Sequence, residues 1–124
     1  MSTSTISWNQ AGIAAGAALV GNLLAFAVGS AANASWEVGQ PQPVGIAAIV
    51  ASSIVPMLIG TVLFNRVPRL QSLLPVGGLD FAIISAPGGY LASQELATGA
   101  ALGAMHVITG LVWLRLTRTV SSAN

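Results

Sequence analysis

The chain has 124 residues, of which 54% are hydrophobic and only 6% charged, and its mean hydropathy is +0.80. A soluble domain carries about 25% charged residues, so this composition excludes an ordinary soluble protein and predicts a membrane protein. The absence of cysteine excludes disulfides and thiolate metal sites. The net charge of +1 argues against nucleic acid as a partner, because there is no basic stripe to neutralise phosphates.

Apolar stretches long enough to cross a bilayer occur four times along the chain. A hydrocarbon core about 30 Å thick requires about 20 residues of apolar helix. The predicted spans cover residues 11–32, 44–64, 70–91 and 96–116. The sequence therefore predicts an all-α, polytopic four-helix bundle that forms a single transmembrane domain over residues 1–124. Pro75, Asp80 and Pro87 interrupt the third span, which we expect to be kinked or broken.

The first span could instead be a signal peptide, because Ala32-Asn33-Ala34 has the small-x-small form of a cleavage site. Two features argue against this interpretation. No basic residue precedes the apolar run, and the run is longer than the usual h-region of about 7–15 residues. We expect an uncleaved helix.

The four arginines predict the orientation of the bundle. Arg66 and Arg69 lie between the second and third spans, and Arg115 and Arg118 lie at the end of the fourth. The other two loops have no basic residue, so the positive-inside rule predicts a plasma-membrane protein with both termini in the cytoplasm. Aromatic side chains near the predicted span ends are expected at the headgroups. They are Trp8, Trp36, Tyr90 and Trp113.

Each predicted span carries a polar residue near its midpoint. These residues are Asn22, the pair Ser52 and Ser53, Asp80 and His106. An ionisable residue at the centre of a membrane helix costs about 2.5–3.5 kcal/mol on insertion scales, so such residues usually face the bundle interior. We therefore expect Asp80 and His106 to meet each other inside the bundle.

Small residues share a helix face with several of these polar groups, which favours an inward orientation. His106 aligns with Gly99, Gly103 and Gly110; Asn22 with Ala18, Ala25 and Gly29; Ser52 with Ala48, Pro56 and Gly60. The spacing of Gly12 and Gly16 is also compatible with a homo-oligomer through a small-residue helix face.

Two interpretations of this polar layer stay open. In the first, it is a hydrogen-bond network that fixes the helix register. In the second, Asp80 and His106 are a catalytic acid–base pair, and Asn22, Ser52 and Ser53 bind the oxygen of a substrate. A single histidine without cysteines predicts no metal site, and no motif for a cofactor is present.

The fourth span carries a resemblance in Leu102-Gly103-Ala104-Met105-His106-Val107-Ile108-Thr109-Gly110. This segment resembles the last helix of a family of small actinobacterial four-helix membrane proteins with a Met-His pair. The resemblance implies that His106 matters, and it implies no reaction.

Three hypotheses for function follow. The preferred one is a membrane protein that binds a small lipophilic molecule, and as an enzyme would transform it by acid–base isomerisation, cyclisation or epoxide opening. The second is a non-catalytic accessory or oligomeric subunit. The third is a proton-coupled transporter or pore, which would require assembly of several four-helix chains.

Overall fold

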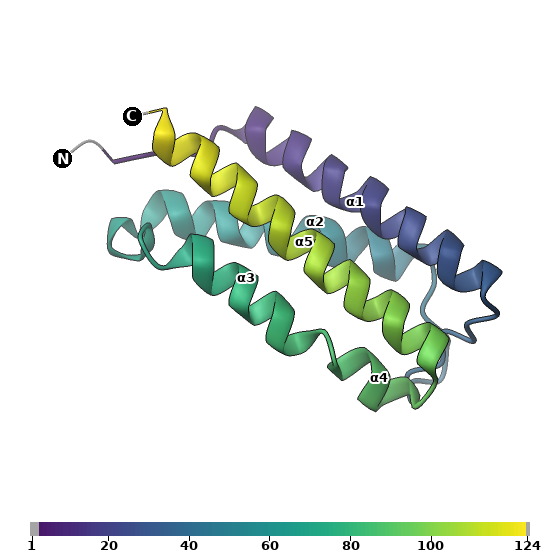
Figure 1. Cartoon of the computed structure of the whole chain (residues 1–124). Coiled ribbons are helices and arrows are strands. Elements are labelled where there is room, and N and C mark those ends of the chain that lie inside the picture. Colours follow the sequence, from purple (N-terminus) through teal and green to yellow (C-terminus); the bar gives the residue numbers. More distant parts are fainter. Residues whose placement is uncertain (1–2, 124) are drawn as a thin grey trace.

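The structure, a computed structural model, describes residues 3–123 as helices joined by short loops, with no strand among them (Figure 1). The elements are α1 (Trp8–Ala31), α2 (Ile46–Arg66), the 3-10 helix η1 (Pro68–Leu70), α3 (Leu74–Ser85), α4 (Gly88–Ser93) and α5 (Leu96–Ser122). Three of them, α1, α2 and α5, are long and apolar enough to cross a membrane. The chain is thus a helical membrane protein, and the prediction of an all-α bundle is confirmed.

The third predicted span is divided into α3, with 12 residues, and α4, with 6. Pro75 stands in the first turn of α3, where the missing N–H of proline is tolerated. At the other end, Pro87 has no N–H to continue the hydrogen-bond ladder beyond Ala86. The expected break is present, and neither piece alone is long enough to span a bilayer.

Two long helices, α1 and α5, form the centre of the bundle, and the other helices pack on them (Figure 1). α2 packs on α1, whereas α3 and α4 pack along α5. Glycines allow several of these close approaches. A Cβ atom at Gly21 would lie 2.8 Å from the Ile108 side chain, and one at Gly110 would lie 2.6 Å from the Cβ of Ala82. Within residues 3–123, no comparable packing joins α2 to α3.

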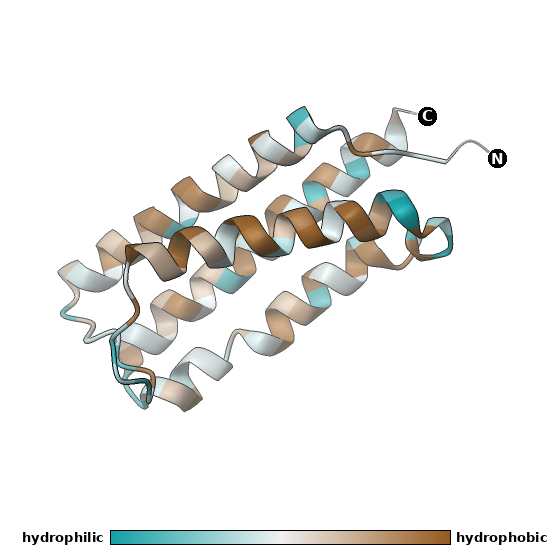
Figure 2. Ribbon diagram, turned by 180° about the vertical axis from the view of Figure 1, so that it is seen from behind, coloured by the Kyte–Doolittle hydropathy of each residue, from teal (hydrophilic) through white to brown (hydrophobic). Residues whose placement is uncertain are grey.

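Large apolar side chains cover the outer surface, as a lipid environment requires. Figure 2 shows α2 as strongly hydrophobic along most of its length. Leu24, Val28, Phe81 and Ile84 are each more than half exposed. Gly12 and Gly16 also face outward, since nothing lies within 4 Å of a Cβ built on either.

The arginine-bearing end of the bundle is tied to the N-terminal segment. The Asn65 side chain donates to the Ile6 carbonyl and accepts from the Ile6 N–H, both at 2.8 Å. The Gln71 amide donates to the carbonyl of Ser4 at 2.7 Å. These contacts hold the segment before α1 against the α2–α3 connection, close to the last turns of α5 (Figure 1).

At the opposite end, Glu95 links the α1–α2 loop to the start of α5. Its carboxylate accepts hydrogen bonds from the Ser35 hydroxyl, the Ser35 N–H and the Thr98 hydroxyl. The pKa of Glu95 is lowered, chiefly by the Ser35 hydroxyl and then by Thr98. Trp36 follows directly, and its indole N–H donates to the Ser30 hydroxyl at 3.1 Å. Trp36 is only 6% exposed and is packed into the bundle, and its expected position at the headgroups stays a prediction.

Candidate functional site

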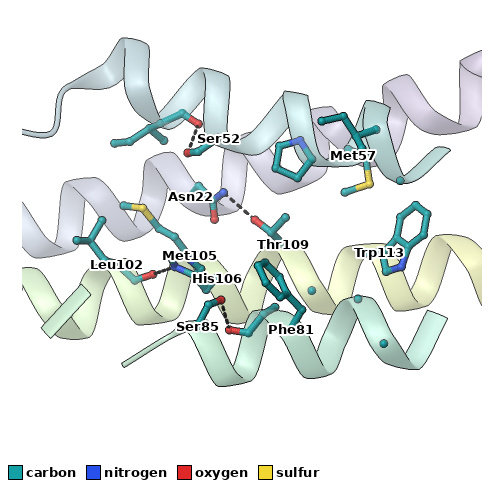
Figure 3. Close-up of a pocket in the computed structure, with 18 of the residues that line it drawn as sticks. Asn22, Ser52, Met57, Phe81, Ser85, Leu102, Met105, His106, Thr109 and Trp113 are labelled. Atoms are coloured by element: carbon teal, nitrogen blue, oxygen red, sulfur yellow. Dashed lines mark hydrogen bonds between the residues drawn. The ribbon is translucent and has the colours of Figure 1, made fainter. Parts of the chain in front are cut away.

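A groove of about 820 Å³ runs between α2 and α3, along the side where these helices are not packed together. Its floor is formed by α1 and α5 (Figure 3). The α2 wall contains the small-residue stripe predicted to align with Ser52, namely Ala48, Pro56 and Gly60. Gly77, Phe81 and Ser85 are on the α3 wall. The lining is predominantly apolar with a few polar groups on the floor, which is typical of sites for small molecules.

Asn22 is the centre of the polar floor and is only 2% exposed. Its amide nitrogen donates to the Ser53 hydroxyl at 2.8 Å and to the Thr109 hydroxyl at 3.1 Å. The Ser53 hydroxyl in turn donates to the Ile49 carbonyl at 2.7 Å. Asn22 and Ser53 thus meet at one depth, as their midpoint positions predicted. Thr109 was not predicted as a member of this network. From the sequence, Gly110 was assigned to helix packing and His106 to acid–base chemistry, and no role was assigned to the hydroxyl between them.

The orientation of the Asn22 amide follows from this network. A carbonyl can only accept, so the Ser53 hydroxyl uses its single proton on Ile49 and must accept from Asn22. The atom beside Ser53 is therefore the amide nitrogen. With both N–H groups used on hydroxyls, the Oδ1 atom of Asn22 is left buried without a hydrogen-bond partner among residues 3–123. An unpaired buried acceptor is uncommon and costs about 1–3 kcal/mol.

His106 also lines the groove, about one helical turn from Thr109 (Figure 3). Its Nδ1 atom lies 2.7 Å from the Leu102 carbonyl, which can only accept, so Nδ1 carries a proton. In the neutral ring, Nε2 then presents a lone pair, and Nε2 has no hydrogen bond within the described residues. His106 is exposed to the groove rather than enclosed in the helix packing.

Ser52 contributes to the groove in a different way from Ser53. The Ser52 hydroxyl donates to the Ile49 carbonyl of its own helix at 3.2 Å. In a regular helix the N–H of residue 56 would donate to the carbonyl of Ser52, but Pro56 has none. Since Ser52 and Pro56 both line the groove, the carbonyl of Ser52 is deprived of its usual partner at the groove wall.

Asp80 does not meet His106. On α3, Gly78 and Ala82 face α5, since a Cβ at Gly78 would lie 2.4 Å from the Trp113 ring and Ala82 abuts Gly110. Asp80 stands two positions from each, which places it on the opposite side of the helix. Its side chain is exposed, is absent from the groove lining and makes no hydrogen bond or ion pair in the described region.

Trp113 fills the end of the groove nearest the arginines. Its indole N–H donates to the Leu74 carbonyl at 2.8 Å, and its ring lies edge-on to Phe64 with centroids 6.4 Å apart. Gly60 and Gly78 leave the space that the ring occupies. Trp113 is only 7% exposed and belongs to the core of the bundle, and its predicted headgroup position stays a prediction. α5 continues to Ser122, beyond the predicted end.

The described residues contain no group of three His, Cys, Asp or Glu side chains that could hold a metal ion. Apart from His106, no side chain that lines the groove is ionisable. The site can therefore offer hydrogen bonds and apolar contact.

A model of a protein family of unknown function, DUF6069, matches residues 2–122. The chain belongs to this family. No curated protein and no solved structure matches the chain. Membership in DUF6069 agrees with the resemblance to an uncharacterised family drawn from the sequence.

Proposed function

We propose that this DUF6069 protein binds a small lipophilic molecule in the groove between α2 and α3. The unpartnered Oδ1 of Asn22 is the observation that carries the proposal, because it is buried on the floor of an open apolar groove. A side chain that served only to fix the helix register would be expected to have all its polar atoms satisfied.

The size and position of the groove support this function. About 820 Å³ lies within the range of about 300–1,000 Å³ typical of small-molecule sites. The groove opens between two helices rather than at a loop-covered end of the bundle. An apolar ligand would therefore enter sideways from the hydrocarbon region.

The polar residues of the groove have distinct roles in this proposal. Asn22 and His106 contact the ligand directly, and Ser53 positions Asn22. Ser52 contributes its carbonyl oxygen, since its hydroxyl is used within α2. Asp80 has no part in ligand binding, because it lies on the other side of α3. Without that carboxylate the predicted acid–base pair is incomplete, and binding is the function that the geometry supports best.

The test is photolabelling in nanodiscs with a decanol that carries a diazirine in its chain. We expect saturable labelling of α2 and α3 residues that line the groove. Gly77→Phe places a ring in the groove and should reduce this labelling at least tenfold. Gly12→Phe is the matched control, because a Cβ at either glycine meets nothing within 4 Å and Gly12 does not line the groove. Equal labelling of both variants and the wild type, or no saturable labelling, contradicts the proposal.

A second candidate function, as a subunit of an assembly, is favoured by Asp80. Its neighbours Leu79 and Ala82 pack at Gly110, next to Thr109, so Asp80 lies at the depth of the Asn22 network. A carboxylate exposed to lipid at this depth costs about 2.5–3.5 kcal/mol on insertion scales. A second copy of the chain that covers the outer face of α3 would remove that contact with lipid.

Counting subunits by single-molecule photobleaching in native membranes tests this second function. The wild type should be oligomeric, and Asp80→Leu should be monomeric. Phe81→Leu is the control, since Phe81 is a neighbouring exposed residue of α3. A monomeric wild type contradicts the assembly.

A further inference from the structure

We infer that the ligand of the groove is an uncharged alcohol or phenol whose hydroxyl group donates a hydrogen bond to Oδ1 of Asn22. This inference rests on the proposed binding function and specifies the chemical class of the ligand.

The groove presents an excess of hydrogen-bond acceptors. Oδ1 of Asn22 is fixed as an acceptor by the Ser53–Ile49 hydrogen bond. Nε2 of His106 is an acceptor in the neutral ring, because Nδ1 holds the proton. The carbonyl of Ser52 is a third acceptor, since Pro56 has no N–H to offer it. A ligand that itself carried only acceptors, such as an ether or a ketone, would leave Oδ1 of Asn22 and Nε2 of His106 unpaired.

One donor stands beside these acceptors. The Thr109 hydroxyl accepts from Asn22 and makes no other hydrogen bond within residues 3–123, so its proton is free for a ligand. A ligand hydroxyl can donate to Oδ1 of Asn22 and accept from Thr109 with the same oxygen. This pair of contacts matches a hydroxyl better than an amine, whose protonated form has no acceptor function.

Charged head groups do not fit the groove. No arginine lines it, so a carboxylate or phosphate would meet no permanent positive charge there. No carboxylate lines it either, because Asp80 is on the outer side of α3 and Glu95 is bound to Ser35 and Thr98. A buried charge without a partner is strongly unfavourable. Fatty acids and phospholipid head groups are therefore excluded in favour of a neutral molecule that lies wholly within the bilayer.

The experiment compares the diazirine-bearing decanol with its methyl ether, which keeps the chain and oxygen but removes the donor. Concentrations are compared as mole fractions in the bilayer. The alcohol should half-saturate labelling of the wild-type groove at about one tenth of the mole fraction that the ether requires. A tenfold preference corresponds to about 1.4 kcal/mol, within the range for one hydrogen bond. Asn22→Leu should abolish the preference. Thr119→Val should keep it, because Thr119 does not line the groove and its hydroxyl donates to the Arg115 carbonyl of its own helix.

The outcomes separate this inference from the proposed function. Equal saturable labelling by the alcohol and the ether in the wild type overturns the hydroxyl requirement and leaves lipophile binding intact. Saturable labelling by neither probe overturns both. If Asn22→Leu does not fold, the wild-type preference decides the matter. Thr109→Val should then weaken labelling by the alcohol and by the ether alike, because Thr109 supplies a donor to the ligand oxygen that both probes carry.

Discussion

The groove has an aromatic end and a polar middle, and their polar atoms are satisfied to different degrees. At the aromatic end, Trp113 is buried and its N–H is bonded to the Leu74 carbonyl. In the polar middle, Asn22 is equally buried, but its Oδ1 has no partner in the described chain. Protein interiors rarely leave polar atoms unpaired. The difference indicates that the aromatic end stabilises the fold, and it supports the proposal that the polar middle receives another molecule.

The largest effect on stability should come from Trp113→Ala. Removing the indole leaves a cavity between Gly60 and Gly78 and removes the hydrogen bond to the Leu74 carbonyl. We expect the free energy of unfolding to fall by about 3–5 kcal/mol. Steric trapping in bicelles measures it. Trp8→Ala, at a side chain 65% exposed, should change it by less than about 0.5 kcal/mol. Similar losses of stability in Trp113→Ala and Trp8→Ala would contradict the conclusion that the aromatic end of the groove stabilises the fold.

Two adjacent glycines of α3 sharpen the same comparison. A Cβ at Gly78 would lie 2.4 Å from the Trp113 ring, whereas one at Gly77 would meet nothing within 4 Å. We expect Gly78→Ala to destabilise the bundle by about 1–3 kcal/mol through overpacking. Gly77→Ala should stabilise it by up to about 1 kcal/mol through helix propensity. The same unfolding assay measures both, and effects of equal sign would contradict the described rotation of α3.

The two serines of α2 test the polar middle. Ser53→Ala removes an acceptor of the Asn22 amide and should lower the free energy of unfolding by about 0.6 kcal/mol, the average for such contacts in a membrane protein. Ser52→Ala should have a smaller effect, because that hydroxyl contacts only its own helix. A larger loss of stability in Ser52→Ala than in Ser53→Ala would contradict the hydrogen bond between Asn22 and Ser53.

The smallest effect is a pH dependence outside the membrane. The pKa of Glu95 lies below its ordinary value of 4.5, because hydrogen bonds from Ser35 and Thr98 favour the carboxylate. A lowered folded-state pKa gives a stabilisation that is complete above about pH 4.5 and is lost as the pH falls through the lowered value. Hydrogen exchange at the Ser35 N–H should accelerate in that acid range. Glu95→Gln should remove the pH dependence, and an unchanged profile in that variant would assign it to another group.

The sequence predicted the features that depend on position along a helix. The lengths of the apolar stretches predicted the long helices. The positions of Asn22 and Ser53 near the midpoints of their spans predicted that these two side chains would meet. The sequence could not predict the rotation of α3, because large apolar residues occur all around this helix and no stripe shows which face meets α5. Asp80 was therefore placed opposite His106, although it faces away. The hydrogen bonds of Thr109 and Trp113 could not be predicted, because they depend on contacts with other helices.

The sideways opening of the groove affects how any affinity must be expressed. A ligand that arrives through the gap between α2 and α3 exchanges with the surrounding acyl chains and not directly with water. Occupancy of the groove then depends on the ratio of ligand to lipid molecules. If the compound is held entirely in the bilayer, dilution with buffer changes neither this ratio nor the occupancy. Detergent and lipid tails act as competitors for the same space. A dissociation constant quoted in molar units would mostly report the partition coefficient of the compound.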